Sequence, residues 1–138
     1  MRVWLSLFAV AAGLCLAPSV SAQDAVKVDP KHYSVVSENN QVRILKIHYG
    51  AHEKSVMHSH PNAVAVFLTD AKGTFTMPDG KTQNFDNKAG TSEYSAAGTH
   101  LPENTGDKAF DIILVELKAK PAAKPAAKPA AKPAAKKE

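Results

Sequence analysis

Short runs of hydrophobic residues, separated by turn signals, fill the chain between residues 32 and 117. Residues 42–49 are rich in β-branched side chains, which favour strands. Residues 63–68 and 109–117 are apolar on both faces, which is typical of strands that are covered on both sides. Asp79-Gly80 separates two more strand patterns and predicts a hairpin, because these turn positions require residues that accept positive φ. The predicted strands are residues 42–49, 63–68, 73–77, 81–85, 91–95 and 109–117.

No convincing amphipathic helix interrupts this series of strands. Many short strands with regular turn signals favour a sandwich or barrel. The pattern therefore predicts a single all-β domain over residues 32–117.

A cluster of histidines is the strongest chemical signal. His58 and His60 are one residue apart, so on a strand their side chains point to the same face. His100, brought in from another strand, would complete a three-nitrogen site for a divalent metal with positions left open for water or substrate. The alternative is that the three histidines are ordinary polar residues of a barrel that binds no metal.

The histidines and the glycines around them resemble the two sequence motifs of the cupin superfamily. The first cupin motif has a glycine, His-x-His, a glutamate and a second glycine, and the matching residues here are Gly50, His58, His60 and Gly73. The second motif has Pro-x-Gly, a histidine and an asparagine, and the matching residues are Ala96, Gly98, His100 and Asn104. The resemblance covers about residues 33–117. It implies a double-stranded β-helix, the jelly-roll barrel of small single-domain cupins, with His58, His60 and His100 as metal ligands.

The chain departs from the cupin pattern at the glutamate. That ligand should fall at Val64, or at Ala65 with the longer spacing, and neither side chain can bind a metal. The three remaining histidines resemble the thiol-dioxygenase branch of the cupins, which uses iron. The resemblance thus implies a divalent metal, with iron first and manganese, zinc or nickel open, and a small-molecule dioxygenase. The alternative function is a module that binds a small ligand or metal without turnover.

The sequence identifies no catalytic side chain. Glu53 and Glu93 are candidate acid-base groups, and His52 is a possible fourth metal ligand from the preceding loop, but each is more simply an exposed surface residue. Three neutral imidazoles leave the full charge of the ion, so we expect an anionic small-molecule ligand. If the face of Val64, Val66 and Leu68 lines the barrel, the pocket is apolar; the alternative is a filled core.

The first 22 residues are typical of a secretory signal peptide. Arg2 precedes an apolar run over residues 3–17, and the small residues Val20-Ser21-Ala22 follow. The run is too short and too interrupted for a membrane span. We therefore expect a periplasmic or secreted protein, with residues 23–31 as an N-terminal linker. The only cysteine, Cys15, lies in the predicted signal, so disulfides and thiolate ligands are excluded from the mature chain.

The last 21 residues, 118–138, consist almost entirely of lysine, proline and alanine. Proline in every Pro-Ala-Ala-Lys repeat prevents a helix, which predicts a disordered tail. Its seven lysines and one acid give +6, whereas residues 23–117 carry −3, so the net charge of +4 comes from the tail. The tail is either a solubilising extension or a tether to polyanions. It has no aromatic residues to stack on bases, so specific nucleic-acid binding is not expected. The small domain would also gain from forming a homodimer.

Overall fold

The computed structural model describes residues 23–119, so the predicted signal peptide and nearly all of the predicted tail lie outside the described residues. One short helix and nine strands make up this part of the chain. The helix is α1 (Ala25–Val28), and the strands are β1 (Tyr33–Glu38), β2 (Val42–Tyr49), β3 (His58–His60), β4 (Ala63–Phe67), β5 (Ala71–Thr76), β6 (Thr82–Asn87), β7 (Ser92–Ser95), β8 (Gly98–Asn104) and β9 (Phe110–Leu117).

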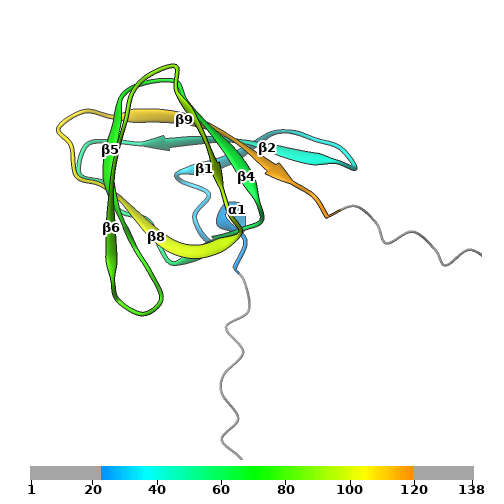
Figure 1. Ribbon diagram of the computed structural model, residues 1–138, viewed down its shortest axis with the longest axis horizontal. Coiled ribbons are helices and arrows are strands. Elements are labelled where there is room, and N and C mark those ends of the chain that lie inside the picture. The colour runs from blue at the N-terminus through cyan, green and yellow to red at the C-terminus, as the bar shows by residue number, and fades with distance from the viewer. Residues whose placement is uncertain (1–22, 120–138) are drawn as a thin grey trace, which may run out of the picture.

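The strands form two antiparallel sheets. One has the order β1-β2-β9-β4-β7 and the other the order β3-β8-β5-β6. Figure 1 shows β5, β6 and β8 on one side of the barrel and β9, β2 and β4 on the other. Strands far apart in sequence are neighbours, as in the β2–β9 ladder, which pairs Val42 with Leu117 and Tyr49 with Phe110. The all-β prediction is confirmed.

Alternation along the strands builds the core between the sheets. In β2, Leu45, Ile47 and Tyr49 are buried, whereas Lys46 and His48 between them face outward. Burying each large apolar side chain contributes roughly 1.5–3 kcal/mol, so these inward residues fix the register of the strand. The predicted strands at residues 42–49 and 109–117 agree with β2 and β9 to within a residue.

Two glycines are required by the backbone of the β5–β6 region. Gly80 has φ of 82° and forms the predicted turn of the β5–β6 hairpin. Gly73 lies within β5, where a Cβ atom would collide with the Phe85 ring and the carbonyl oxygen of Glu103. The glycine thus allows β5 to lie close to β6 and β8.

Residues 23–31 are not the linker that the sequence suggested. Asp24 caps α1 by accepting a hydrogen bond from the Val26 amide at 3.0 Å, and Ala25 is fully buried. The Gln23 carbonyl oxygen accepts a hydrogen bond of 2.8 Å from the amide of Ser59 in β3. The segment therefore packs against the strand that carries His58 and His60. Among the described residues, no helix has the length and apolar character needed to span a membrane.

Candidate metal centre

Two neighbouring strands bring the three predicted ligands together. His58 and His60 lie on β3, and the antiparallel β3–β8 ladder places His100 directly opposite His58. Ligand nitrogens of the three rings all lie within 4.8 Å of one another. The ring centroids of His58 and His100 are 5.2 Å apart, and those of His58 and His60 are 4.9 Å apart. The period-two argument for β3 is confirmed, and the pairing with β8 supplies the third ring.

The hydrogen bonds of His58 leave one of its nitrogens available. Its Nδ1–H donates to the Val56 carbonyl oxygen at 2.8 Å, because a carbonyl can only accept. Its Nε2 therefore carries a lone pair, and this fully buried atom has no hydrogen-bond partner in the described structure. An unpaired buried acceptor is costly, so its place among two other imidazoles fits a metal ligand.

His60 is held by a carboxylate. Its Nδ1–H donates to Oε1 of Glu116 at 2.6 Å, and Nε of Arg43 donates to Oε2 of the same carboxylate at 2.5 Å. Burial by itself raises the pKa of Glu116, but the hydrogen bonds from His60 and Arg43 bring it below its usual value. Glu116 is therefore ionised, and it leaves Nε2 of His60 with a lone pair for a metal.

Glu116 was missed by the sequence analysis, although a signal for it exists. In β9 the buried positions are Phe110, Ile112, Leu114 and Glu116, every second residue. A glutamate that continues a buried alternation needs a partner inside the fold. The apolar character of both faces of β9 concealed this position in the sequence.

The histidines form part of the wall of a cavity of about 410 Å³. His60 and His100 line it, while the fully buried His58 lies behind them. The ring of His100 stacks on Phe75 with a centroid distance of 4.6 Å and an interplanar angle of 13°. Aromatic and small apolar residues supply most of the remaining wall, among them Tyr33, Phe67, Phe75, Phe85, Phe110, Ala63 and Ala65. A cavity of this size accommodates a small molecule next to the histidines.

Solved structures with this architecture include cupins. A cupin domain from Bordetella pertussis Tohama I is 22% identical, with a TM-score of 0.59 over 63% of this chain and 92% of its own. An RmlC-like cupin with a double-stranded β-helix fold from Methanocaldococcus jannaschii is 17% identical, with a TM-score of 0.51 over 62% and 77% of the two chains. The chain has the cupin fold. The polyketide cyclase RemF from Streptomyces resistomycificus is 10% identical, with a TM-score of 0.50 over 64% of this chain and 66% of the cyclase.

These likenesses concern the fold alone. No family model matches the sequence, and no curated protein matches it significantly. The chemistry of this chain must therefore be argued from its own site. Three imidazole nitrogens that face one another, one of them buried without a partner, fit a divalent ion.

The structure corrects the predicted lining of the cavity. Ala63, Ala65 and Phe67 of β4 face the interior and line it, whereas Val64 and Val66 are half-buried on the opposite face. Leu68 follows β4 and is 51% exposed. Both faces of this run are apolar, so its composition did not show which face is inside. Of the two candidate positions for the cupin glutamate, Ala65 is the one that lies on the cavity wall.

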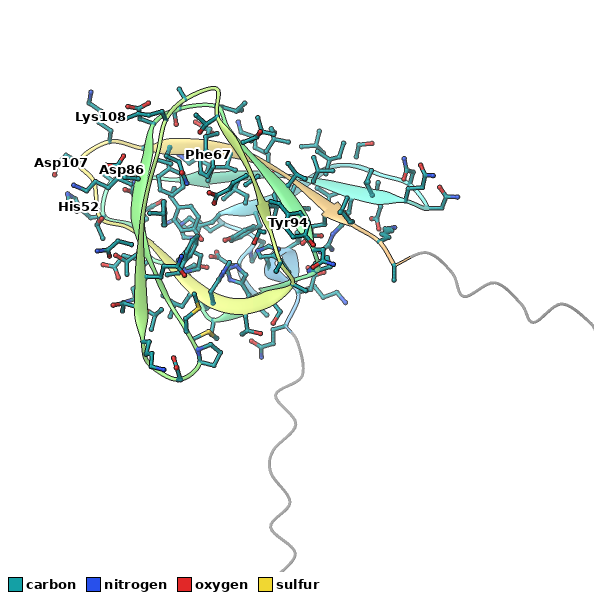
Figure 2. All side chains as sticks on the ribbon, viewed as in Figure 1. His52, Phe67, Asp86, Tyr94, Asp107 and Lys108 are labelled. Carbon is teal, nitrogen blue, oxygen red and sulfur yellow. The ribbon has the colours of Figure 1, made fainter. Side chains whose placement is uncertain are left out.

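Most of the other candidate residues lie away from the histidine cluster and the cavity. His48 pairs with Asp111 at 3.1 Å on the outer face of β2. Figure 2 shows His52 beside Asp107 at the outside of the domain, where the two side chains are 2.9 Å apart. Glu53 accepts hydrogen bonds from Lys31 and from the amide of Gly50, away from the cavity. His52 and Glu53 thus lie outside both the histidine cluster and the cavity lining, whereas Glu93 lines the cavity.

His32 has a structural role that its sequence context did not reveal. It is buried, its Nδ1 lies 2.7 Å from Asp29, and its ring stacks on Tyr49 at a centroid distance of 4.2 Å. The Tyr49 hydroxyl is 2.9 Å from that of Tyr33, whose ring packs at 4.7 Å against His58. This network supports the metal centre from behind. His32 precedes the first strand, where no local pattern indicates burial.

Burial keeps His58 and His100 neutral. Burial and the neighbouring His60 lower the pKa of His58 to about 4. Burial, together with His60 and His58, lowers the pKa of His100 to about 3. Both rings are therefore unprotonated at neutral pH, which is the form that binds metal.

The lowered pKa of His58 predicts an acid-sensitive fold in the metal-free protein. Below pH ~6.5 the unfolded chain binds a proton at His58, but the folded chain does not until about pH 4. The free energy of unfolding should thus fall between these values, by roughly 3 kcal/mol from His58 alone. Urea unfolding from pH 7 to pH 4 measures this loss. His58→Gln should flatten the profile in this window, and identical slopes in both proteins would contradict the assignment.

Proposed function

We propose that the protein is a metal-dependent cupin in which His58, His60 and His100 hold a divalent ion, iron first, and that it oxidises a small molecule with dioxygen. The observation that carries the proposal is the position of the three histidines. Their nitrogens converge at the wall of an apolar cavity, and two of the three rings face that cavity directly. Three protein ligands leave coordination positions open for a substrate atom.

The residues around the site have two roles: some orient the histidine rings, and others bind the small molecule. His58 and His60 each donate Nδ1–H to a fixed acceptor, so both rings are held with Nε2 as the free nitrogen. The aromatic wall, including Phe75 against His100, holds the apolar part of a small molecule and excludes water. A bound divalent ion would supply Lewis acidity and, if it is iron, chemistry with dioxygen.

Anaerobic reconstitution with ferrous iron, followed by oxygen electrode measurements, tests the proposal. The panel should contain small thiols and carboxylates, because an anionic donor atom suits the open positions of the ion. Oxygen uptake above background is expected with at least one compound and with iron present, and not in the His100→Ala variant. No uptake with any compound in an iron-loaded protein would contradict the dioxygenase proposal.

A non-catalytic binding module is the second candidate, and the residue that favours it is Ala65. This alanine lies on the cavity wall at a position where cupins carry a metal-binding glutamate, so the ion has one protein ligand fewer. Calorimetric binding of a compound to the loaded protein, without its consumption, would support this candidate over the enzyme.

Restoring the acid should strengthen the site. Ala65→Glu would place a carboxylate in the cavity, and we expect it to tighten binding of divalent metal while it lowers the melting temperature of the metal-free protein, since it buries a charge. Val64→Glu is the matched control, because it adds the same group on the opposite face. Metal titration by calorimetry measures both variants. Tighter binding in Val64→Glu but not in Ala65→Glu would show that the cavity has been assigned to the wrong face.

Export and tethering belong to the same proposal and are supported by the sequence alone. Cleavage after Ala22 would leave Gln23 as the first residue, and mass spectrometry of the exported protein tests this. An intact Met1 terminus would refute export.

The lysine-rich tail would bind a cell-surface polyanion. Truncation at Lys118 should abolish retention on a polyanionic resin at low salt. The proposal also includes a homodimer, which sedimentation analysis of the domain would detect.

A further inference from the structure

Glu93 differs from every other acidic residue in residues 23–119. Each of the other described aspartates and glutamates has an ion-pair partner, such as Lys54 for Glu103 or Arg43 for Glu116. The remaining acids pair as follows: Asp24 with Arg43, Asp29 with His32, Glu38 with Lys118, Glu53 with Lys31, Asp70 and Asp86 with Lys88, Asp79 with Lys81, Asp107 with His52 and Asp111 with Lys46. No ion pair or side-chain hydrogen bond joins Glu93 to any described residue.

Glu93 is also the acidic residue that lines the cavity. No lysine or arginine is found among the lining residues, and the two histidines among them, His60 and His100, belong to the candidate metal centre. Glu93 thus provides the only carboxylate on the cavity wall. A negative charge without a countercharge makes this end of the cavity attractive to a cation.

The surroundings of Glu93 suit a ligand with an apolar body. Glu93 lies on β7 directly opposite Ala65 of β4, and Phe67 is the next residue on that face of β4. The diagonal neighbours in such a ladder lie roughly 7–8 Å apart, so a single small ligand can contact both side chains. Phe67 and Tyr94, both labelled in Figure 2, are among the residues that line the cavity. Aromatic faces also attract cations.

The cavity opens near Glu93 and the aromatic residues around it. The lining residues of β6 and β7 include the exposed Gln83, Glu93 and Tyr94, whereas those of β4 and β9 are buried. β6 and β7 are the edge strands of their sheets. A ligand that enters between these edges meets Glu93 at the opening and the histidines farther inside.

We propose that the ligand of this cavity carries a positively charged amine, which pairs with Glu93 while an aromatic or apolar body lies against the phenylalanines. This inference rests on the proposed function, since it names the ligand class of the same cavity. It extends the expectation of an anionic ligand: the anionic donor atom belongs at the histidines and the ammonium group at Glu93. The ligand thus has opposite charges at its two ends.

Binding to the metal-free protein tests the charge preference separately from the metal. Three probes of similar shape are benzylamine, benzyl alcohol and benzoate, which are cationic, neutral and anionic. Titrations followed by NMR, with the methyl groups of Ala63 and Ala65 reporting on the cavity, give the affinities. Benzylamine should bind roughly two- to fivefold more tightly than benzyl alcohol, as expected for an exposed ion pair, and benzoate should bind most weakly.

Three variants show whether Glu93 causes the preference. Glu93→Gln should reduce the affinity for benzylamine to that for benzyl alcohol without changing the latter, and Glu93→Asp should restore part of the difference. Glu103→Gln is the matched control, because this glutamate pairs with Lys54 outside the cavity lining and its loss should change nothing.

Several results would overturn the inference. They are benzoate binding as tightly as benzylamine, a preference unchanged in Glu93→Gln, and no binding of any probe at millimolar concentration. None of these results depends on the metal. A failure of the amine preference would therefore leave the three-histidine proposal standing, and loss of metal binding would leave the amine preference standing.

Discussion

Alanine at His58, His60 or His100 should reduce the metal content of the purified protein from about one ion per chain to a small fraction of that value. Each substitution leaves two nitrogen ligands. Loss of an outer partner of a ligand alone costs roughly 10–100-fold in affinity, so loss of a ligand should cost more than ~100-fold. Elemental analysis after dialysis, together with calorimetric titration of the metal-free protein, measures both quantities.

The controls for this experiment are the exposed histidines. His48→Ala and His52→Ala remove side chains that are 54% and 64% exposed on the outside of the domain, so their metal content should remain that of the wild type. His32 is unsuitable as a control, because it is buried beside Tyr49 and its loss would disturb the fold. Unchanged metal content in all three cluster variants would eliminate the site.

Glu116→Gln should weaken metal binding and destabilise the protein together. A glutamine can accept a hydrogen bond from either His60 or Arg43, but its amide group then faces the other donor. We expect metal affinity to fall roughly 10–100-fold because the orientation of His60 is lost. The free energy of unfolding should fall by roughly 3 kcal/mol, since a buried ion pair loses one partner.

A measurement of the His60 tautomer separates the effect on the ligand from the effect on stability. Nitrogen NMR of the metal-free protein should show the Nδ1–H form of His60 in the wild type and a mixture of tautomers in Glu116→Gln. Glu103→Gln breaks an exposed pair with Lys54 and should cost less than ~1 kcal/mol with no change in metal affinity. If Glu116→Gln lowers stability but leaves both the tautomer and the metal affinity unchanged, Glu116 supports the fold and does not orient His60.

The alternation of side chains allowed much of the fold to be predicted. In β2 the polar Lys46 and His48 mark the outer face, so the buried positions followed from the sequence alone. The β5–β6 hairpin was equally clear, because Asp79-Gly80 is a local turn signal and needs no distant contact. The same local rule placed His58 and His60 on one face of β3. These features depend on neighbours in sequence, and the sequence determined them.

Contacts between distant strands decided the rest. β4 is apolar on both faces, and only its position between β7 and β9 shows that Ala65 rather than Val64 faces the cavity. Glu116 meets His60 because β9 pairs with β4, which begins three residues after that histidine. Residues 23–31 pack against β3 through a backbone contact to Ser59, which no composition reveals. Each of these depends on which strands become neighbours, and that is decided by the burial of the whole core at once, not by any local pattern.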